Sequence, residues 1–321
     1  MNYIVFDLEW NQADFADAAN TVKELPFEII DIGAVKLNHE RYMVDEFDQL
    51  VKPQVYSRMH YITSQIIHLH MRDLMKGKPF PKMMAEFLAW CGDDYIFCTW
   101  GDCDLVELQR NMRYYFMPLF SDGPFRYLDV QKLFSIAYED RKSRRSLESA
   151  IDFLHLQKDI PFHRAFSDAY YTAKILAELP EGVLANYSYD TFVLPRSRGE
   201  EIYTTFENYH KYISVEFPGR GSAVSDREVM STRCYLCGGR HIKRKIKWFS
   251  TNGRQFHSVA YCPVHGYMKS KLRLKKAIDH GIYVVKTAKF IDEKRYLEIR
   301  ERKAGAMSVA TYLSKGRHLK P

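Results

Sequence analysis

The sequence contains few cysteines and no long apolar run. Only 6 of its 321 residues are cysteine, too few for a small secreted domain held by disulfides. Cys91, Cys98 and Cys103 lie in or beside apolar segments, and we expect them to be buried as small hydrophobic side chains. No apolar stretch reaches the roughly 18 residues of a membrane-spanning helix, and Met1 leads directly into a predicted strand instead of a signal peptide. We therefore expect a reduced, cytoplasmic protein that does not bind membranes.

Charge is distributed unevenly along the chain, and this asymmetry predicts two domains. Residues 1–190 carry 20 basic and 29 acidic side chains, a net charge of −9, whereas residues 191–321 carry 27 and 11, a net charge of +16. A length of 321 residues also favours two domains. We place the first domain at 1–185, a connector and linker at 186–232, and a basic domain with a C-terminal tail at 233–321.

Apolar periodicity in the first domain predicts a mixed α/β sheet. Three consecutive strands come first without a helix between them, at 3–9, 28–37 and 41–51. Helices then alternate with strands, with helices at 81–90 and 105–115 and strands at 95–99 and 125–130. An antiparallel start followed by this alternation is typical of a mixed sheet flanked by helices.

Acidic side chains follow the apolar part of the first predicted strand. Asp7 and Glu9 are two residues apart, so both point to the same face of the strand. Two carboxylates this close repel each other unless a cation lies between them. Paired acids also occur on the solvated face of ordinary strands, so Asp7 and Glu9 alone do not establish a site.

A third candidate acid follows the predicted strand at 95–99. The chain passes through Trp100 and Gly101 into a helix that starts near Asp102 and Asp104. One of these two acids can cap the helix N-terminus, which leaves the other for a metal. The spacing alone leaves both assignments open.

The last two candidates are His163 and Asp168. An apolar stripe between Ala165 and Ala177 predicts a helix of about four turns. Five residues along a continuous helix would put His163 and Asp168 on different faces, so we expect His163 to lie outside the regular helix. An imidazole titrates near neutral pH, and His163 can therefore act as a general base. A lone histidine at a helix start is otherwise more often a cap or a surface group.

These five side chains together suit phosphodiester hydrolysis. That reaction needs a water made nucleophilic near neutral pH and charge neutralisation at the phosphate and the leaving oxygen, and two divalent cations provide both. Mg²⁺ takes oxygen ligands and is typically held by a few carboxylates and substrate phosphates. Four carboxylates and one imidazole match this task.

The order Asp-x-Glu, Asp, His-x4-Asp resembles the DEDDh family of 3′-to-5′ exonucleases, which includes proofreading subunits of DNA polymerases, RNase T and histone-mRNA exonucleases. The segments FEIIDIGAVKLN and SLESAIDFL, the latter leading into HRAFSDAYYTAKIL, are also similar to that family. The resemblance covers roughly residues 1–185. It implies an RNase H-like fold with a five-stranded mixed sheet flanked by helices.

The resemblance also implies a role for each of the five residues. It implies that Asp7 and Asp168 are direct metal ligands and that Glu9 holds the nucleophilic water. Asp104 would reach the second ion largely through water, and His163 would be the general base. The implied cofactors are two Mg²⁺ or Mn²⁺ ions.

Two details of the resemblance concern the surroundings of these acids. In the family the central acid commonly opens the helix after the strand, which favours Asp104 over Asp102. Thr residues commonly follow the second acid of the first motif, but here Trp10, Asn11 and Gln12 follow it. This departure leaves open which side chains hold the terminal nucleotide in place. Trp10 can offer a stacking face for a base.

The basic domain contains a pattern of zinc ligands. Three thiols and an imidazole occur in two pairs at two-residue spacing, which matches four-coordinate Zn²⁺: Cys234, Cys237, Cys262 and His265. The turn signal Asn252-Gly253 and a return strand at 255–261 predict a zinc-ribbon hairpin between the pairs. His241 or His257 can replace the last ligand, and the cysteines can also be ordinary reduced thiols. Four protein ligands leave no open position, so we expect a structural ion that organises a domain too small to build much core.

The same domain interleaves basic and aromatic side chains. We expect the following residues to contact nucleic acid: Lys243, Arg244, Lys245, Lys247, Trp248, Lys271 and Arg273. Cations neutralise phosphates and aromatic rings stack on bases, which suits single-stranded RNA or DNA. Charged runs are also common on faces that are merely solvated.

Two functions fit the sequence. The first is a 3′-to-5′ exonuclease whose basic domain holds a single strand, and the second is a non-catalytic nucleic-acid-binding protein built on a nuclease fold. The presence of all five chemical groups favours the enzyme. The sequence does not show which side chains would meet a 2′-hydroxyl, so RNA and DNA both stay open as substrates.

Overall fold

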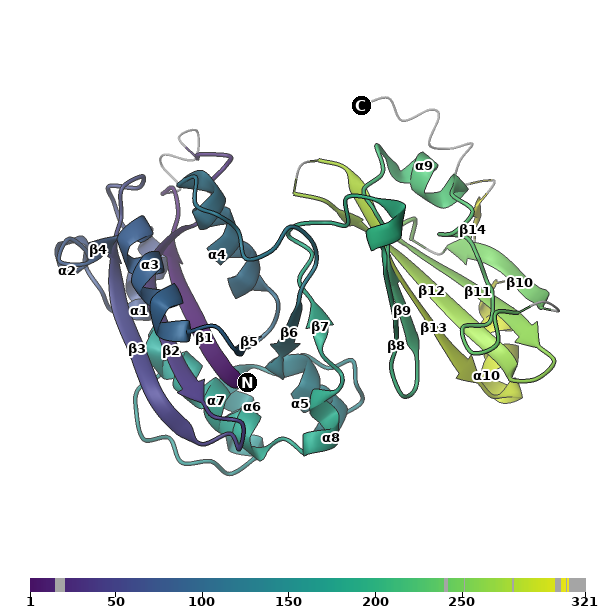
Figure 1. Cartoon of the computed structure of the whole chain (residues 1–321), viewed down its shortest axis with the longest axis horizontal. Helices are drawn as coiled ribbons and strands as arrows, with labels where there is room; N and C mark the ends of the chain where they lie inside the picture. Colours follow the sequence, from purple (N-terminus) through teal and green to yellow (C-terminus); the bar gives the residue numbers. More distant parts are fainter. Residues whose placement is uncertain are drawn as a thin grey trace. The chain divides into compact units, whose positions relative to one another are not determined.

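The computed structural model describes residues 1–14, 21–239, 242–250, 252–278, 280–303, 307–309 and 311. The chain divides into two compact units, Met1–Thr191 and Phe192–Pro321, and each unit contains one seven-stranded sheet (Figure 1). Within the described ranges, no helix has both the length and the apolar character that crossing a membrane requires.

The sheet of the first unit has the strand order β4-β3-β2-β1-β5-β6-β7. Its longer strands are β1 (Asn2–Asn11), β2 (Glu28–Leu37), β3 (Met43–Lys52), β5 (Tyr95–Thr99) and β6 (Arg126–Asp129). β1 pairs antiparallel with β2 and parallel with β5, so the sheet is mixed. Two-residue strands lie at its edges, β4 (Lys78–Pro79) and β7 (Ser188–Tyr189). The predicted mixed sheet is confirmed, with these short edge strands added to the five expected ones.

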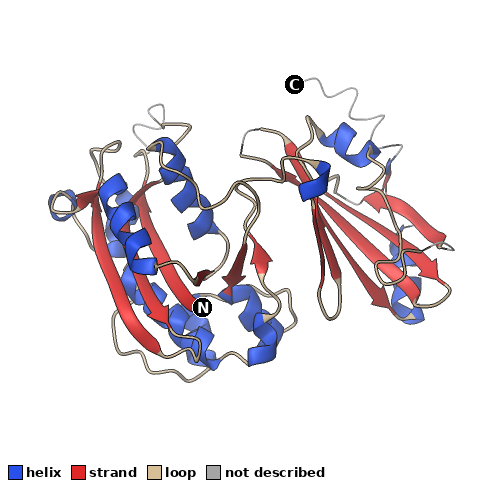
Figure 2. Cartoon of the chain, in the orientation of Figure 1, coloured by secondary structure: helices blue, strands red, loops and turns tan. Residues whose placement is uncertain are grey.

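Helices cover both faces of this sheet (Figure 2). One apolar cluster lies under α3 (Phe80–Cys91) and α4 (Cys103–Tyr114), and the other lies under α5 (Val130–Tyr138), α6 (Leu147–Phe153) and α7 (Ala165–Glu178). The remaining helices are short: α1 (Tyr61–Ile67), α2 (Met71–Leu74) and α8 (Glu181–Leu184). Residues of β1 alternate between the clusters, because Phe6 belongs to the first and Val5 to the second. Asp7 and Glu9 share the face of Val5 and therefore face α7.

The second unit is built on an antiparallel sheet with the order β14-β10-β11-β12-β13-β9-β8. Its strands are β8 (Ile202–Thr205), β9 (His210–Ile213), β10 (Lys243–Ser250), β11 (Gln255–Cys262), β12 (Gly266–Lys276), β13 (Ile282–Ile291) and β14 (Met307–Ser308). A short 3-10 helix, Arg198–Glu200, precedes β8. α9 (Arg220–Ser225) packs on one apolar cluster of this sheet, and α10 (Glu293–Arg302) packs on another.

The structure corrects three expectations. Residues 186–232 are more than a connector, since β8, β9 and α9 belong to the second sheet and its core. The predicted hairpin is present as β10 and β11, but it lies in a larger sheet whose buried Trp248 and Phe256 build a sizeable apolar core. Cys103 is exposed, because the first turn of α4 directs Asp104 and Leu105 inward and leaves Cys103 outside. Cys91 and Cys98 are buried as expected.

Candidate active site

Three carboxylates meet where α7 crosses β1. Asp7 and Glu9 come from the central strand β1, and Asp168 comes from the first turn of α7. One oxygen atom from each of the three carboxylates lies within 4.8 Å of the other two. Each side chain is only partly buried, so the cluster is open to an incoming ligand.

α7 approaches the two strand acids closely because a glycine lies beneath its first turn. Gly33 on β2 pairs with Asp7 across the sheet. A Cβ at Gly33 would lie 1.9 Å from the backbone nitrogen of Phe166. Only a residue without a side chain permits this approach of helix to strand. The close packing is what brings Asp168 to the strand acids.

The structure distinguishes Asp104 from Asp102. Asp104 lies in the first turn of α4 and is 6% exposed. Asp102 occupies the N-cap position, is exposed, and makes no capping hydrogen bond through its side chain. After burial, Asp104 is the group that raises the pKa of Asp7 most. Asp104 is therefore the acid that lies beside the strand acids, just outside the group of three.

Burial raises the pKa of every carboxyl in this site, and neighbouring acids raise it further at Asp7, Glu9 and Asp104. The pKa of Glu9 rises to about 8 through burial first and then through Asp168 and other acids. The pKa of Asp104 rises to about 7, mainly through burial, although backbone amides partly offset the shift. Burial also raises the pKa of Asp168, against a hydrogen bond from His163. Carboxyls that cannot all ionise on their own fit a divalent cation with oxygen ligands.

His163 lies two residues before α7, outside the regular helix as expected. Its backbone is left-handed, with φ of +70°, a conformation that costs a non-glycine residue about 1 kcal/mol and persists where the surroundings fix it. The His163 backbone N–H donates to Oδ1 of Asp168 at 3.4 Å. The side chain is exposed, so this turn holds the imidazole beside Asp168 and accessible to substrate.

An ion pair beside the site was not predicted from the sequence. Asp31 on β2 lies opposite Glu9 and is fully buried. Arg164, the residue after His163, places its Nε 2.7 Å from Oδ2 of Asp31. A lone acid inside the apolar run IIDIGAV was the available signal, because a buried carboxylate needs a partner. The pair ties the His163 turn to the strand next to Glu9.

Trp10 and Asn11, which depart from the commonest family motif, have structural contacts, and those of Asn11 hold a loop in place. Asn11 is fully buried. Its amide donates to the Arg58 carbonyl at 2.8 Å, and its Oδ1 accepts from the His60 backbone N–H at 2.8 Å. Trp10 is partly buried against Phe27, with ring centroids 5.8 Å apart. Asn11 therefore holds the segment before α1, and part of the Trp10 ring stays exposed.

A comparison with protein families decides what kind of domain carries this site. The family RNase_T, described as exonuclease, matches residues 4–176, more than half of the chain. The chain belongs to this exonuclease family. The match confirms the predicted resemblance and makes the first unit a nuclease domain with an RNase H-like fold.

Solved structures give weaker matches to the exonuclease chain. The nuclease domain of 3′hExo, a DEDDh family member bound to rAMP, is 19% identical, with 55% of this chain and 90% of that chain covered and a TM-score of 0.47. Cell-death related nuclease 4 (CRN-4) is 18% identical over 55% and 62% of the two chains, with a TM-score of 0.45. E. coli Exonuclease I in complex with a 5cy-dT13 oligonucleotide is 14% identical over 57% and 40%, with a TM-score of 0.40. No curated protein matches the chain, so the family match carries the assignment.

Beyond the exonuclease domain, the second unit gathers the four predicted zinc ligands. Their ligand atoms lie within 4.8 Å of one another: Cys234, Cys237, Cys262 and His265. The Sγ atoms of Cys237 and Cys262 are 3.6 Å apart. A disulfide would need about 2.05 Å, whereas two thiolates on one tetrahedral Zn²⁺ lie about 3.8 Å apart. Burial raises the pKa of Cys262, but the His265 ring and backbone N–H groups outweigh it and lower this pKa to about 6. The donor set therefore fits zinc.

His257, one of the two alternative histidine ligands, is not part of this group. His257 lies on β11, with its ring 5.9 Å from that of Phe249. His241 lies outside the described residues. Of the two histidines that the structure describes, His265 is the one that lies with the cysteines.

The residues predicted to contact nucleic acid are spread over two strands, and one of them is corrected. Exposed cations on β10 are Lys243, Arg244, Lys245 and Lys247, and β12 carries partly buried Lys271 and exposed Arg273. Trp248 is only 4% exposed, and its Nε1 donates to the Met230 carbonyl at 2.9 Å. Its ring belongs to the apolar core of the second unit and cannot stack on a base.

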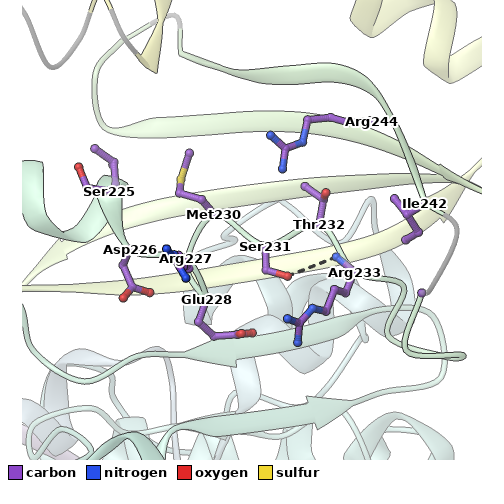
Figure 3. A pocket seen from close by; sticks show the side chains of 12 residues that line it. Ser225, Asp226, Arg227, Glu228, Met230, Ser231, Thr232, Arg233, Ile242 and Arg244 are labelled. Atoms are coloured by element: carbon purple, nitrogen blue, oxygen red, sulfur yellow. Dashed lines mark hydrogen bonds between the residues drawn. The ribbon is translucent and has the colours of Figure 1, made fainter.

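Arg244 lines a pocket of 620 Å³ in the second unit (Figure 3). The segment after α9 supplies Arg227, Met230 and Arg233, and Ile242 adds an apolar side chain. The Arg233 backbone N–H donates to Ser231 within this lining, as the dashed line in Figure 3 marks. Arg244 is thus directed into a mixed polar pocket, apart from the lysines of β10.

Proposed function

We propose that the protein is a metal-dependent 3′-to-5′ exonuclease that hydrolyses phosphodiester bonds of single-stranded RNA or DNA. One observation carries this proposal. Three carboxylates of an exonuclease-family domain lie within 4.8 Å of one another, with Asp104 and His163 beside them. These groups include every side chain that a two-metal hydrolysis with a general base requires.

The side chains of the site divide metal binding, water orientation and proton transfer among them. Asp7, Glu9, Asp104 and Asp168 would hold two Mg²⁺ or Mn²⁺ ions, which supply an activated water and neutralise charge on the phosphate when bound. Glu9 orients the attacking water from the end of β1. His163 is exposed beside Asp168 and takes the proton from that water. The left-handed turn at His163 keeps this residue next to Asp168.

The second unit would hold the strand and a structural Zn²⁺. Residues 191–321 carry a net charge of +16, and cations on β10 and β12 can neutralise phosphates. Three thiols and an imidazole give zinc a closed set of four ligands, which suits a structural ion. Lys243, Lys245, Lys247, Lys271 and Arg273 are the phosphate contacts that we propose on these strands.

A 5′-labelled oligonucleotide incubated with Mg²⁺ or Mn²⁺ tests the enzymatic proposal. We expect products that shorten from the 3′ end. Asp7→Ala should lower the rate at least about a hundredfold, which corresponds to about 3 kcal/mol of lost transition-state stabilisation. Asp102→Ala is the matched control, because this exposed carboxylate makes no side-chain capping bond, and it should keep the native rate.

Two outcomes would count against this proposal. Shortening from the 5′ end would refute the direction of hydrolysis. Binding of the oligonucleotide by the native chain without any shortening would instead indicate a non-catalytic nucleic-acid-binding protein. Matched RNA and DNA strands in the same assay would show whether a 2′-hydroxyl affects the rate.

A further inference from the structure

Two strands and one helix of the second unit bring four cations together. Lys269 on β12 lies opposite Lys289 on β13 in the antiparallel register. Arg295 and Arg302 are seven residues apart on α10 and therefore share one face of the helix. Both arginines act electrostatically on Lys269. We call these four residues, Lys269, Lys289, Arg295 and Arg302, the α10 cation cluster.

Packing fixes the position of α10 and hence of its arginines. Ile299 is 3% exposed and joins an apolar cluster with Ile246 and Val259 of the sheet. The Tyr296 ring stacks on Tyr267 of β12, with centroids 4.4 Å apart and an interplanar angle of 8°. Arg295 and Arg302 flank these contacts along the helix. The sheet therefore holds the two guanidinium groups beside Lys269.

The α10 cation cluster is under electrostatic strain. Burial and four neighbouring cations, Arg295 foremost, lower the pKa of Lys269 to about 8. His257 on the adjacent strand β11 lies opposite Lys271. Burial and nearby cations, with Lys269 and Lys271 first among them, lower the pKa of His257 to about 4. Of the four cluster residues, Arg295 alone forms an ion pair within the described part of the chain, with Glu298.

Partly buried cations that repel one another destabilise a fold, and a bound anion relieves that repulsion. Lys289 and Arg302 are exposed, so an anion can reach the cluster from solvent. Lys and Arg bind phosphate through charge-assisted hydrogen bonds.

We propose that the α10 cation cluster is a binding site for the phosphate groups of a nucleic-acid strand. The choice of a nucleic acid as the anion rests on the proposed function. The site adds α10 and β13 to a binding surface that the sequence placed on β10 and β12 only. It predicts that affinity for a strand depends on where the positive charges lie as well as on how many there are.

Fluorescence anisotropy of a 5′-labelled single-stranded oligonucleotide tests the proposal on the full chain carrying Asp7→Ala. The test variant adds Lys269→Ala and Lys289→Ala. The matched control adds Lys276→Ala, on the opposite face of β12, and Lys294→Ala, exposed on α10. We expect the test variant to lose about tenfold in affinity and its salt slope to fall by about 1.4, or 0.7 for each lost phosphate contact. The control should lose less than about threefold in affinity, because removing a cation that contacts no phosphate releases no counterion.

A second variant avoids the partly buried position. Lys289→Ala with Arg302→Ala changes only exposed side chains and should weaken binding by a comparable factor. Melting curves should show that none of these variants unfolds at lower temperature than the control, because each removes repulsion.

Three results would overturn the proposal. The first is an equal loss of affinity in the test and control variants, and the second is a salt slope that does not change in the test variant. The third is that poly-glutamate displaces the labelled strand as readily as unlabelled oligonucleotide does at equal charge. The last result would assign the cluster to an acidic protein. The measurement needs no hydrolysis, so a native chain that fails to shorten oligonucleotides would refute the proposed enzyme and leave this binding result standing.

Discussion

At the scale of single residues, Arg164 links the general base candidate to the sheet. Its Nε bonds to Asp31, which is fully buried, whereas the Arg164 side chain is 34% exposed. Burial raises the pKa of Asp31, whereas the hydrogen bond and the charge of Arg164 lower it. The pair therefore gives a buried carboxyl group its partner and holds the chain next to His163. Arg164 is a positioning residue, since it acts through its neighbour.

We predict that Arg164→Met lowers the free energy of unfolding of the first unit by about 2 kcal/mol, because it leaves the buried Asp31 unpaired. It should also lower kcat about tenfold with little change in KM, because His163 loses its tether. The double variant Arg164→Met with Asp31→Asn should regain most of the stability and little of the rate. Urea unfolding and initial rates on a labelled oligonucleotide measure both effects. Full recovery of kcat in the double variant would show that the pair serves stability alone.

At the scale of elements, the contact between α7 and β2 sets the spacing of the carboxylates. Gly33 is the point at which helix and strand touch, and any Cβ there would overlap the Phe166 backbone. α7 carries Asp168 in the same turn that lies over Gly33. A small outward displacement of the helix would therefore separate Asp168 from Asp7 and Glu9.

We predict that Gly33→Ala destabilises the first unit by about 3 kcal/mol through overpacking. Its metal-dependent nuclease rate should fall by about a hundredfold, because a displacement near 1 Å in a catalytic group is enough for such a loss. The control is Gly123→Ala, since a Cβ at Gly123 meets nothing within 4 Å, and it should change stability by less than about 0.5 kcal/mol. Thermal melts and initial rates provide the comparison. Unchanged rates in Gly33→Ala would show that α7 can shift without affecting the site.

The sequence predicted the elements whose periodicity is local. β2 and β5 have their predicted bounds, and α7 lies where the apolar stripe placed it. We expected no strand at β12 although its apolar and basic residues alternate, because Lys271 and Arg273 were considered only as contacts to nucleic acid. The burial of Trp248 and the pairing of Asp31 with Arg164 depend on contacts between distant segments. The five motif residues could be predicted because a family pattern fixes them, whereas their packing partners could not.

At the scale of the whole molecule, each unit has its own sheet and core, so each should respond separately to the loss of a metal. The Cys/His cluster lies at one end of the second sheet. Tyr235, next to Cys234, packs with Met268 and Ala288 of that sheet, and its ring stacks on His210 of β9 at 5.4 Å. The Cys/His residues are therefore attached to the sheet through this small cluster, and a separate apolar cluster of the same sheet contains Trp248 and Phe256.

We predict that a zinc-selective chelator lowers the melting midpoint of the second unit by about 5 °C or more, which for a unit of this size is at least about 1 kcal/mol. The first unit should keep its midpoint, because its oxygen ligands do not favour zinc over other cations.

Cys237→Ser should lower the midpoint of the second unit in the same way, and elemental analysis of this variant should find no zinc. Cys103→Ser changes another exposed thiol, outside the cluster, and should retain one zinc per chain. A native chain that contains no zinc, and whose melting midpoint does not change with chelator, would contradict the zinc assignment. Complete unfolding of the second unit by chelator would mean that its apolar core cannot hold the sheet alone.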